Sequence, residues 1–300
     1  MKTIAERLAE EVKPIRLHLP GIKKEFSERG GMPKFPISTL PELNEKIWGL
    51  HKGLTVIGAR SSMGKSSFAL QVARDFVDQK IPTLFLSLEM DVNSLIERLF
   101  CQLMKVDNFE MTCGRINHDT EIQKKWEAFE LFIQRVPLLI TNGIGKSFAE
   151  VNTLINALNP KPRCVIVDYI QGIKQSERER SELNEYIRSF RQLMLENNMV
   201  GILASQVNRQ IVDNNDRKPT LENLKSTGVL EEHADMVLLL YWSYFYSRKE
   251  EERNRYEVIV AKNRNGKTGV HNVMYYPEHY LFEEVTIPQP AKDIFGGEAV

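Results

Sequence analysis

A strand, a short glycine-containing loop and a helix follow one another near residue 60, and they constrain this chain more than any other feature. The apolar run Leu54–Ile57 leads into Gly58–Ser66, which reads GARSSMGKS, and apolar residues then recur with helical spacing. The segment matches the phosphate-loop pattern GxxxxGK[ST], except that Ala59 replaces the first glycine. In such a loop, backbone N–H groups at a helix N-terminus surround a phosphate chain. We therefore expect a nucleotide site within an α/β fold.

The loop predicts roles for individual side chains. Lys65 is expected to reach the β- and γ-phosphates of ATP, and the Ser66 hydroxyl is expected to ligate Mg²⁺. An ordinary turn between a strand and a helix is the alternative, which the flanking strand and helix make the weaker interpretation. The residues expected to bind the nucleotide are Ala59, Arg60, Ser61, Ser62, Met63, Gly64, Lys65, Ser66 and Ser67.

Apolar runs alternate with helical periodicity from about residue 50 onward. The expected strands are 54–58, 83–87, 138–141, 164–168, 201–205 and 236–241, and the expected helices are 65–79, 92–105, 121–135, 148–158 and 181–197. Near-continuous apolar strands separated by helices predict a mostly parallel sheet that is covered by helices on both faces. Runs at 256–261 and 270–276 flank Asn265-Gly266, which predicts a C-terminal β-hairpin.

The ends of the chain differ from its middle. Residues 3–13 have the pattern of a short amphipathic helix, because Ile4, Leu8 and Val12 recur every four residues. Prolines and glycines crowd residues 14–38, which we interpret as a tether. The predicted parts are a linker helix with its tether (1–38), a large α/β domain (39–285) and a tail (286–300). The helix packs either on its own chain or on a neighbouring subunit.

Composition narrows the class of protein. The chain has 40 basic and 40 acidic residues, which argues against a broadly basic nucleic-acid binder but permits a local basic lining. Its three cysteines form no CxxC pair and its histidines form no HExxH pattern, so neither a zinc site nor a disulfide framework is predicted. Apolar runs stay far below the ~18 residues of a membrane-spanning helix. We expect a cytoplasmic protein without a membrane partner.

Three polar residues follow strands that should end at the same edge as the loop. Asp168 ends an apolar run in the manner of a Walker B aspartate, which holds the water shell of Mg²⁺. Glu89 would face Lys65 across the crevice at the carboxyl edge of the sheet and orient or deprotonate the attacking water. Glu89 would also suit the start of the next helix. Gln206 could sense the γ-phosphate from a central strand.

Six ordered motifs resemble the motor domain of DnaB-type replicative helicases, within the RecA-like ATPase superfamily. The resemblance extends from about Phe35 to Glu283, and Ala59 is usual in this family. Ser61 stands where bacterial members commonly have proline, which suggests a divergent branch, for example a bacteriophage-encoded one. The motifs are Gly58–Ser66, Ser87–Met90, Val167–Gln171, Ser205–Arg209, Gly228–Asp235 and Lys262–Gly266.

The resemblance implies a hexameric ring that hydrolyses ATP between subunits and translocates 5′→3′ on single-stranded DNA to unwind duplex. It implies that Glu89 is the catalytic glutamate, Asp168 the Walker B aspartate and Gln206 the link to the DNA-binding loops. It also implies that Lys262 and Arg264 reach the neighbour's γ-phosphate, where an arginine finger contributes ~10³–10⁵ in rate. From sequence alone, the last two would be assigned to a solvated hairpin tip.

The family's DNA-contacting loops correspond to residues 172–182 and 209–228. Basic and acidic residues nearly cancel in both loops, so each subunit should bind phosphate weakly and in a salt-dependent way. Several subunits around one strand would restore affinity. Ser226 departs from the acidic residue often found there. The residues expected to contact DNA are Lys174, Arg178, Arg209, Arg217, Lys218, Lys225, Ser226 and Gly228.

Family members also carry an N-terminal helical domain that engages primase, whereas only the predicted helix and tether precede the α/β domain here. Primase and a helicase loader are the implied protein partners. Two other interpretations stay open. One is a RecA- or RadA-like recombination or signalling ATPase that assembles without unwinding, and the other is a nucleotide-gated scaffold for primase or a loader. The presence of both Glu89 and Arg264 argues against the scaffold.

Overall fold

The computed structural model describes residues 35–144, 146–168, 179–207, 218–224 and 227–285, together with Leu19, Lys23 and Pro33. Backbone contacts divide the chain into residues 1–34 and 35–300, and the fold below is that of the second unit. The predicted helix at 3–13 and the tail at 286–300 lie outside the described residues. Among the helices that are described, none combines the length and apolarity needed to cross a bilayer.

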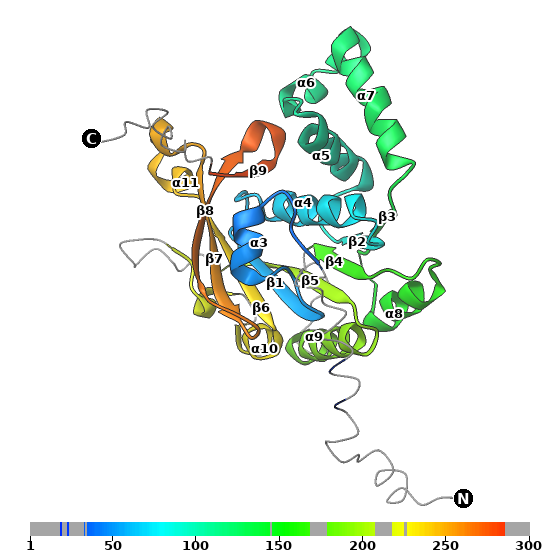
Figure 1. Ribbon diagram of the computed structural model, residues 1–300, viewed down its shortest axis with the longest axis vertical. Helices are drawn as coiled ribbons and strands as arrows, with labels where there is room; N and C mark the ends of the chain where they lie inside the picture. The colour runs from blue at the N-terminus through cyan, green and yellow to red at the C-terminus, as the bar shows by residue number, and fades with distance from the viewer. Residues whose placement is uncertain are drawn as a thin grey trace, which may run out of the picture. The chain divides into compact units, whose positions relative to one another are not determined.

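One nine-stranded sheet forms the centre of this unit, in the order β3-β2-β4-β5-β1-β6-β7-β8-β9 (Figure 1). The first six strands in that order are parallel and the last three are antiparallel. Every residue of β1, β2, β4 and β6 is buried, which explains their continuous apolar runs. The strands are β1 Gly53–Ala59, β2 Thr83–Ser87, β3 Leu138–Asn142, β4 Cys164–Asp168, β5 Val200–Gln206, β6 Met236–Tyr241, β7 Arg255–Asn263, β8 Gly269–Tyr276 and β9 Leu281–Glu284.

Helices cover both faces of the parallel strands, as predicted (Figure 1). Two separate hydrophobic clusters, one on each face, bury the sides of the sheet. On the first face lie α3 Pro41–Ile47, α4 Lys65–Asp78, α5 Val92–Met104, α6 Asn108–Thr112 and α7 Thr120–Ile133, and on the second lie α8 Phe148–Ala157, α9 Glu179–Glu196 and α10 Thr227–His233. A short helix, α11 Tyr244–Ser247, follows β6.

The predicted strands and helices agree with the structure to within two residues at each end. The short helices α3, α6, α10 and α11 were not predicted, and two other features differ. The core begins at Phe35 instead of residue 39, because Phe35 is buried and bridges Leu50, and Ile37 is fully buried. The hairpin of β7 and β8 also gains a third strand, β9. The prolines near residue 35 had suggested a tether that continued further.

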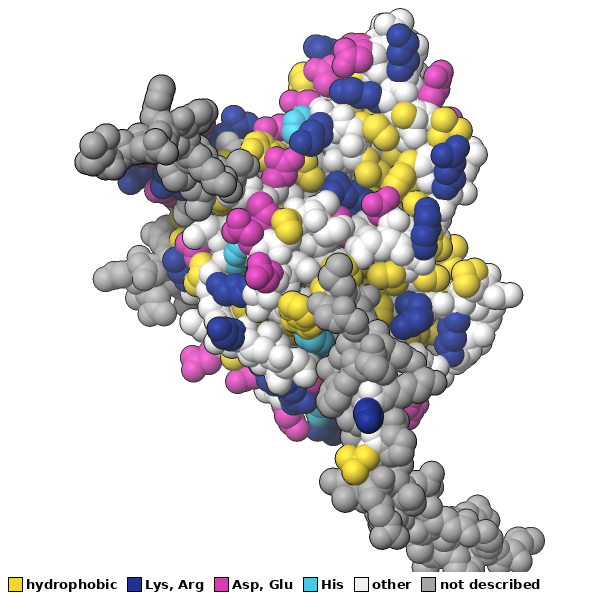
Figure 2. Space-filling model, viewed as in Figure 1, with side chains coloured by type: hydrophobic (Ala, Val, Ile, Leu, Met, Phe, Trp, Pro, Cys, Tyr) yellow, Lys and Arg dark blue, Asp and Glu magenta, His cyan; other side chains and the backbone are white. Residues whose placement is uncertain are grey.

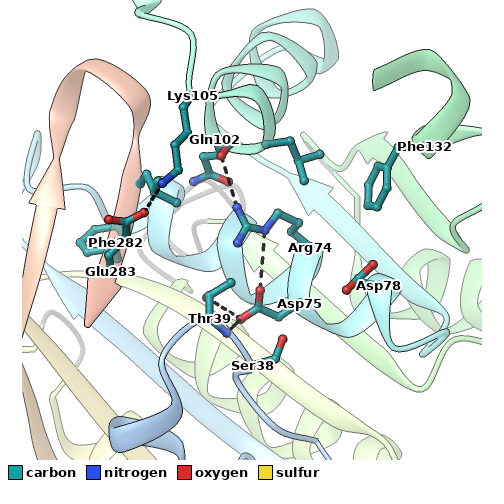
Figure 3. A pocket seen from close by; sticks show the side chains of 12 residues that line it. Ser38, Thr39, Arg74, Asp75, Asp78, Gln102, Lys105, Phe132, Phe282 and Glu283 are labelled. Atoms are coloured by element: carbon teal, nitrogen blue, oxygen red, sulfur yellow. Dashed lines mark hydrogen bonds and ion pairs between the residues drawn. The ribbon is translucent and has the colours of Figure 1, made fainter. Parts of the chain in front are cut away.

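Polar contacts on buried Asp75 fix the start of the core (Figure 3). The Thr39 backbone N–H and hydroxyl donate to Asp75 Oδ2 at 3.0 and 2.7 Å. Burial raises the pKa of Asp75, although the neighbouring Arg74 opposes that rise. The contacts attach the segment before α3 to the side of α4.

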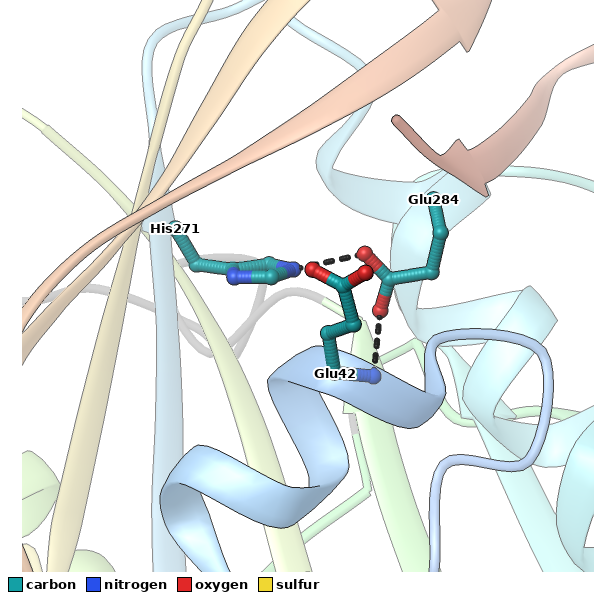
Figure 4. A group of neighbouring side chains, drawn as sticks. All are labelled: Glu42, His271 and Glu284. Carbon is teal, nitrogen blue, oxygen red and sulfur yellow. Dashed lines mark hydrogen bonds and ion pairs between the residues drawn. The ribbon is translucent and has the colours of Figure 1, made fainter. Parts of the chain in front are cut away.

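A carboxylate from the last strand caps the first helix of the core (Figure 4). Glu284 Oε1 accepts hydrogen bonds from the backbone N–H groups of Glu42 and Leu43, at 2.8 and 3.0 Å. Glu284 Oε2 lies 2.8 Å from His271 Nε2. The Glu42 carboxylate also approaches this group. Because both oxygens of Glu284 have partners, the cluster is accounted for as a helix cap that ties β9 to α3.

Four aromatic rings pack beneath the glycine-containing loop. Phe282 lies 4.4 Å from the Tyr275 ring, 5.0 Å from Tyr256 and 5.2 Å from Phe68, measured between centroids. The Gln71 side chain bonds both the N–H and the C=O of Phe282, at 2.8 and 2.7 Å. These contacts hold β9 against α4.

We expect Phe282→Ala to lower the free energy of unfolding by ~3–5 kcal/mol, because a fully buried ring is lost and a cavity remains. Urea unfolding followed by circular dichroism measures the change. Val270→Ala is the matched control, since Val270 lies on neighbouring β8 with 44% of its surface exposed, and it should change stability by less than ~0.5 kcal/mol. Equal effects of the two substitutions would contradict this account of β9.

Candidate active site

The loop between β1 and α4 turns sharply at two left-handed residues. Ser62 has φ 65° and Gly64 has φ 76°. A side chain at Gly64 would bring a Cβ within 3.0 Å of Phe282 and 3.2 Å of Tyr275. The backbone conformation therefore favours glycine, and the aromatic rings below leave too little space for a side chain without shifting. The turn places the first N–H groups of α4 at the carboxyl edge of the sheet, where they can face an anion.

A pocket of about 210 Å³ opens at this edge. Loop residues after β1, Glu89 after β2 and Gln206 at the end of β5 meet there, so the carboxyl ends of three parallel strands contribute to one site. The lining residues are Arg60, Ser61, Ser62, Gly64, Lys65, Ser66, Glu89, Met90, Arg98 and Gln206.

Lys65 and Asp168 form a buried ion pair at the base of the site. Lys65 Nζ lies 3.2 Å from Asp168 Oδ1, and their side chains are 8% and 0% exposed. The other carboxylate oxygen, Asp168 Oδ2, is buried and has no hydrogen-bond partner within the described ranges. An unpartnered carboxylate oxygen on Asp168 and the hydroxyl of Ser66, the residue next to Lys65, are oxygen ligands that suit a hard cation such as Mg²⁺. The predicted magnesium residues therefore fit the ion.

Backbone contacts at the ends of β2 and β4 hold the turn that carries Glu89. The Leu88 N–H donates to the Asp168 carbonyl at 2.6 Å, which extends the pairing of the two strands by one residue. Ser87 Oγ donates to the Met90 carbonyl at 2.6 Å and accepts from the Met90 N–H at 3.1 Å. Glu89 is exposed between these fixed residues and borders the pocket. A carboxylate so held can orient or deprotonate a water molecule.

Gln206 contacts the loop directly. It lies opposite Ala59 in the β1–β5 ladder, and its Nε2 donates to Ser61 Oγ at 2.6 Å. The next residue, Val207, continues the connection through its N–H to the Ala59 carbonyl at 2.9 Å. The strand that precedes the second predicted DNA loop is therefore bonded to the phosphate loop.

Lys262 and Arg264 lie at the amino edge of the parallel strands, opposite the edge that carries the pocket of the same chain. β7 runs antiparallel to β6, and Lys262 pairs with Val237 at the amino end of β6. The ladder shifts register between Val237 and Leu238, so Ala261 is the extra residue of a bulge. The bulge allows Lys262 to point toward α10, where its Nζ donates to the carbonyl of Glu231. Neither side chain can reach the phosphate loop of its own chain.

The comparison with known families decides the identity. The family described as DnaB-like helicase C terminal domain matches residues 37–284. The chain belongs to this family.

Curated relatives and solved structures agree with this DnaB-like assignment. A probable plasmid replicative DNA helicase of Chlamydia psittaci is 31% identical over 70% of this chain and 47% of its own length. The replicative DNA helicase DnaB of Haemophilus influenzae is 26% identical over 84% of this chain and 56% of its own length. The chain therefore spans about half the length of these relatives.

Among solved structures, one described as an ATPase domain superposes with a TM-score of 0.84 at 25% identity, over 92% of this chain and 100% of that one. A second structure, described as a DnaB-like replicative helicase and its interactions with primase, has a TM-score of 0.81 at 25% identity and covers 95% of this chain and 72% of that one. The predicted RecA-like ATPase fold is thus confirmed for this DnaB-like domain.

Three predicted loop residues of the DnaB-like domain point into the core. Ala59, Met63 and Ser67 are buried and do not line the pocket. The Tyr256 hydroxyl donates to the Met63 carbonyl, and Tyr275 hydrogen-bonds the Ser67 side chain. These side chains support the loop from below, while Arg60, Ser61, Ser62, Gly64, Lys65 and Ser66 border the pocket.

Arg98 is a pocket residue that the sequence reasoning missed. It projects from α5, and its guanidinium lies 4.7 Å from the Tyr280 ring, a cation–π distance that restricts the side chain. Arg60, on the other side of the pocket, is held similarly by the Phe245 and Tyr246 rings and donates to the Tyr246 hydroxyl at 2.9 Å. No motif spacing marks Arg98, since it enters the site from the second turn of α5.

Two of the predicted DNA-contacting residues lie in the described part of the DnaB-like domain. Lys218 pairs with Glu257 at 2.8 Å and lies 5.8 Å from the Tyr241 ring. Gly228 is exposed in the first turn of α10 and has open space around it. The remaining predicted contacts, Lys174, Arg178, Arg209, Arg217, Lys225 and Ser226, lie outside the described residues.

Proposed function

We propose that this chain is the ATP-hydrolysing motor of a replicative DNA helicase. A single observation carries the proposal: Glu89 and the Lys65 that pairs with Asp168 line one pocket, while Arg264 lies at the far edge of the sheet. A complete nucleotide site would then need two subunits. Family membership and the two replicative helicase relatives support this interpretation.

ATP would bind with its phosphates along the loop and the first turn of α4, where Lys65 neutralises charge on the β- and γ-phosphates. Ser66, and Asp168 through water, would hold Mg²⁺, which neutralises the charge that develops on the phosphate oxygens. Glu89 would orient the attacking water and accept its proton. Arg264 of the next subunit would stabilise the transition state, which makes turnover depend on assembly.

A ring is proposed from the separation of the two half-sites, and its size of six subunits from the resemblance to DnaB-type helicases. A contact between different surfaces of identical chains closes into a ring when its rotation permits. The edge strand β3 and the adjoining α7 expose Leu139 and Leu131, and Ile144 is exposed just beyond β3. Figure 2 shows hydrophobic side chains reaching the surface in this part of the molecule. Exposed apolar residues beside an open sheet edge are typical of an interaction surface.

Single-stranded DNA is the proposed polymer substrate. Gln206 joins the phosphate loop to the segment that contains residues 209–226, so loss of the γ-phosphate could shift that segment. The formal net charge is zero, and Figure 2 shows basic and acidic side chains interspersed on one face. Binding should therefore depend on several subunits acting together. We propose translocation from 5′ to 3′, primase and a loader as partners, and the cytoplasm of a bacterial or phage-infected cell as the setting.

The rate of ATP hydrolysis per subunit, measured against protein concentration, tests the proposal. We expect the rate to rise with concentration to a plateau and to increase with added oligonucleotide, because each pocket requires a neighbour. A forked duplex with a 5′ tail should be unwound under the same conditions. A concentration-independent rate would contradict the shared site. Stimulated hydrolysis without strand displacement would instead identify a recombination or signalling ATPase, and negligible turnover would identify a scaffold.

A further inference from the structure

Asp235 lies at the centre of a charged cluster at the amino edge of the sheet. The Arg191 guanidinium binds its carboxylate in a bidentate manner, with Nε 3.0 Å from Oδ2 and Nη2 2.8 Å from Oδ1. Arg264 Nη1 donates to Oδ1 at 3.2 Å, and Arg264 Nη2 donates to the Glu232 carbonyl at 2.7 Å. One carboxylate therefore fixes one guanidinium and orients a second.

The Asp235 carboxylate is itself rigidly placed. Oδ2 accepts from the Leu54 N–H at 2.9 Å, and the Asp235 backbone bonds both the Leu54 carbonyl and the Arg264 N–H. Gly53, with φ 105°, allows this approach, because a Cβ there would lie 2.3 Å from Oδ2. The cluster is thus built on the first residues of β1, the strand that leads to the phosphate loop.

Acidic and basic side chains meet in this cluster, because Glu231 also acts on Lys262. Arg191 and Arg264 both bind the carboxylate of Asp235, and the carbonyls of Glu231 and Glu232 accept hydrogen bonds from Lys262 and Arg264. Burial, followed by the charge of Arg264, lowers the pKa of Lys262. Arg264 keeps 43% of its side chain exposed, whereas Asp235 is only 12% exposed. The exposed side of the Arg264 guanidinium could therefore bind an anion while its buried side stays bonded to Asp235.

We propose that Asp235, supported by Arg191, is a positioning residue that orients Arg264 toward the ATP of the neighbouring subunit. The inference rests on the proposed function, since it requires Arg264 to act in trans. A guanidinium that already has one nitrogen on a fixed carboxylate and another on a fixed carbonyl loses little conformational freedom when it binds phosphate. Without Asp235, the long side chain would sample many rotamers.

Asp235→Asn tests the assignment, with Glu283→Gln as the matched control because Glu283 forms an exposed ion pair with Lys105 elsewhere. We expect Asp235→Asn to lower kcat about 10²-fold, the typical cost of misplacing a catalytic group by about 1 Å. The KM for ATP should stay within about twofold, because the subunit's own pocket is intact. Glu283→Gln should behave like the wild type. A near-normal kcat for Asp235→Asn would overturn the proposal.

A mixing assay separates positioning from a general structural role. Lys65→Ala subunits lack a working pocket but offer an intact Arg264, so mixing them with Asp235→Asn subunits should restore hydrolysis measured without DNA. At equal amounts, about one interface in four joins an intact pocket to an intact arginine in a ring of heterologous contacts. Arg264→Ala mixed with Lys65→Ala is the control for the trans arrangement.

The outcomes are distinct. If Arg264→Ala is rescued but Asp235→Asn is not, Asp235 does not act through Arg264 and the inference fails. If neither is rescued, the trans site of the proposed function fails with it. Should Asp235→Asn lose its folded circular dichroism spectrum, Arg191→Lys replaces it, since a lysine cannot make the bidentate contact. Arg191→Lys should lower kcat and be rescued in the same mixture, and absence of either effect would overturn the inference.

Discussion

Glu89→Gln is expected to reduce steady-state ATP hydrolysis by ~10²–10⁴-fold while leaving ATP binding intact. The substitution keeps the size and shape of the side chain but removes its ability to accept a proton. Folding should be unaffected, because Glu89 is exposed and the turn is held by Ser87, Leu88 and Met90. Phosphate release and binding of a fluorescent ATP analogue, measured on the same preparation, separate the two effects.

Two further variants serve as controls for the Glu89→Gln experiment. Lys65→Ala should lose hydrolysis together with most of its ATP affinity, since it removes the cation that pairs with Asp168 at the base of the pocket. Glu97→Gln changes an exposed acid on α5, away from the pocket lining, and should hydrolyse ATP normally. Normal turnover by Glu89→Gln would remove that residue from the mechanism, whatever the other two variants show.

Arg264→Ala is expected to lower kcat by ~10³–10⁵-fold, the usual contribution of an arginine finger. ATP affinity should change little, because this side chain lies at the edge of the sheet opposite its own pocket. Arg264→Lys should retain a small part of the rate, since an ammonium supplies charge without the planar pair of donors that now contacts Asp235 and Glu232. Single-turnover and steady-state phosphate release measure these differences.

Lys267→Ala is the control for Arg264→Ala, because Lys267 is an exposed cation on the turn that joins β7 to β8. It should hydrolyse ATP like the wild type. Sedimentation must show that the Arg264→Ala protein still assembles, so that a lower rate cannot be explained by dissociation of the ring. An assembled Arg264→Ala protein with an unchanged kcat would exclude the arginine from the shared site.

The residues of the candidate active site could be predicted from the sequence because they follow buried parallel strands. Buried strands appear as uninterrupted apolar runs, and a polar residue that ends such a run marks the carboxyl edge of the sheet. Asp168 and Glu89 were predicted in this way, and in the structure Asp168 pairs with Lys65 while Glu89 lines the same pocket as Lys65. The local sequence around each strand was sufficient for this prediction, because each strand supplies its own residue to the same edge of the sheet.

Features that depend on contacts between distant segments of the chain could not be predicted from the sequence. Arg98 enters the pocket only because α5 packs on α4, and β9 is a short strand whose pairing with β8 leaves half of its residues partly exposed. The contacts of Asp235 involve residues from α9, β1 and the β7–β8 turn. Its place in the sequence, after a helix and before an apolar run, would suit an ordinary strand start. Only the tertiary contacts of Asp235 distinguish it from a residue that simply begins a strand.

Strand β7 is in contact with its own nucleotide loop near one end and presents Lys262 and Arg264 at the other. Tyr256 bonds the Met63 carbonyl beneath that loop, and Lys262 follows six residues later along the same strand. An extended strand rises about 3.4 Å per residue, so these two points are roughly 20 Å apart. In the proposed ring, strand β7 would connect the ATP site of its own subunit to that of the neighbour and set the spacing between the two ATP molecules. A displacement of the loop around one triphosphate would then be transmitted along β7 and its bulge to the arginine that contacts the next triphosphate.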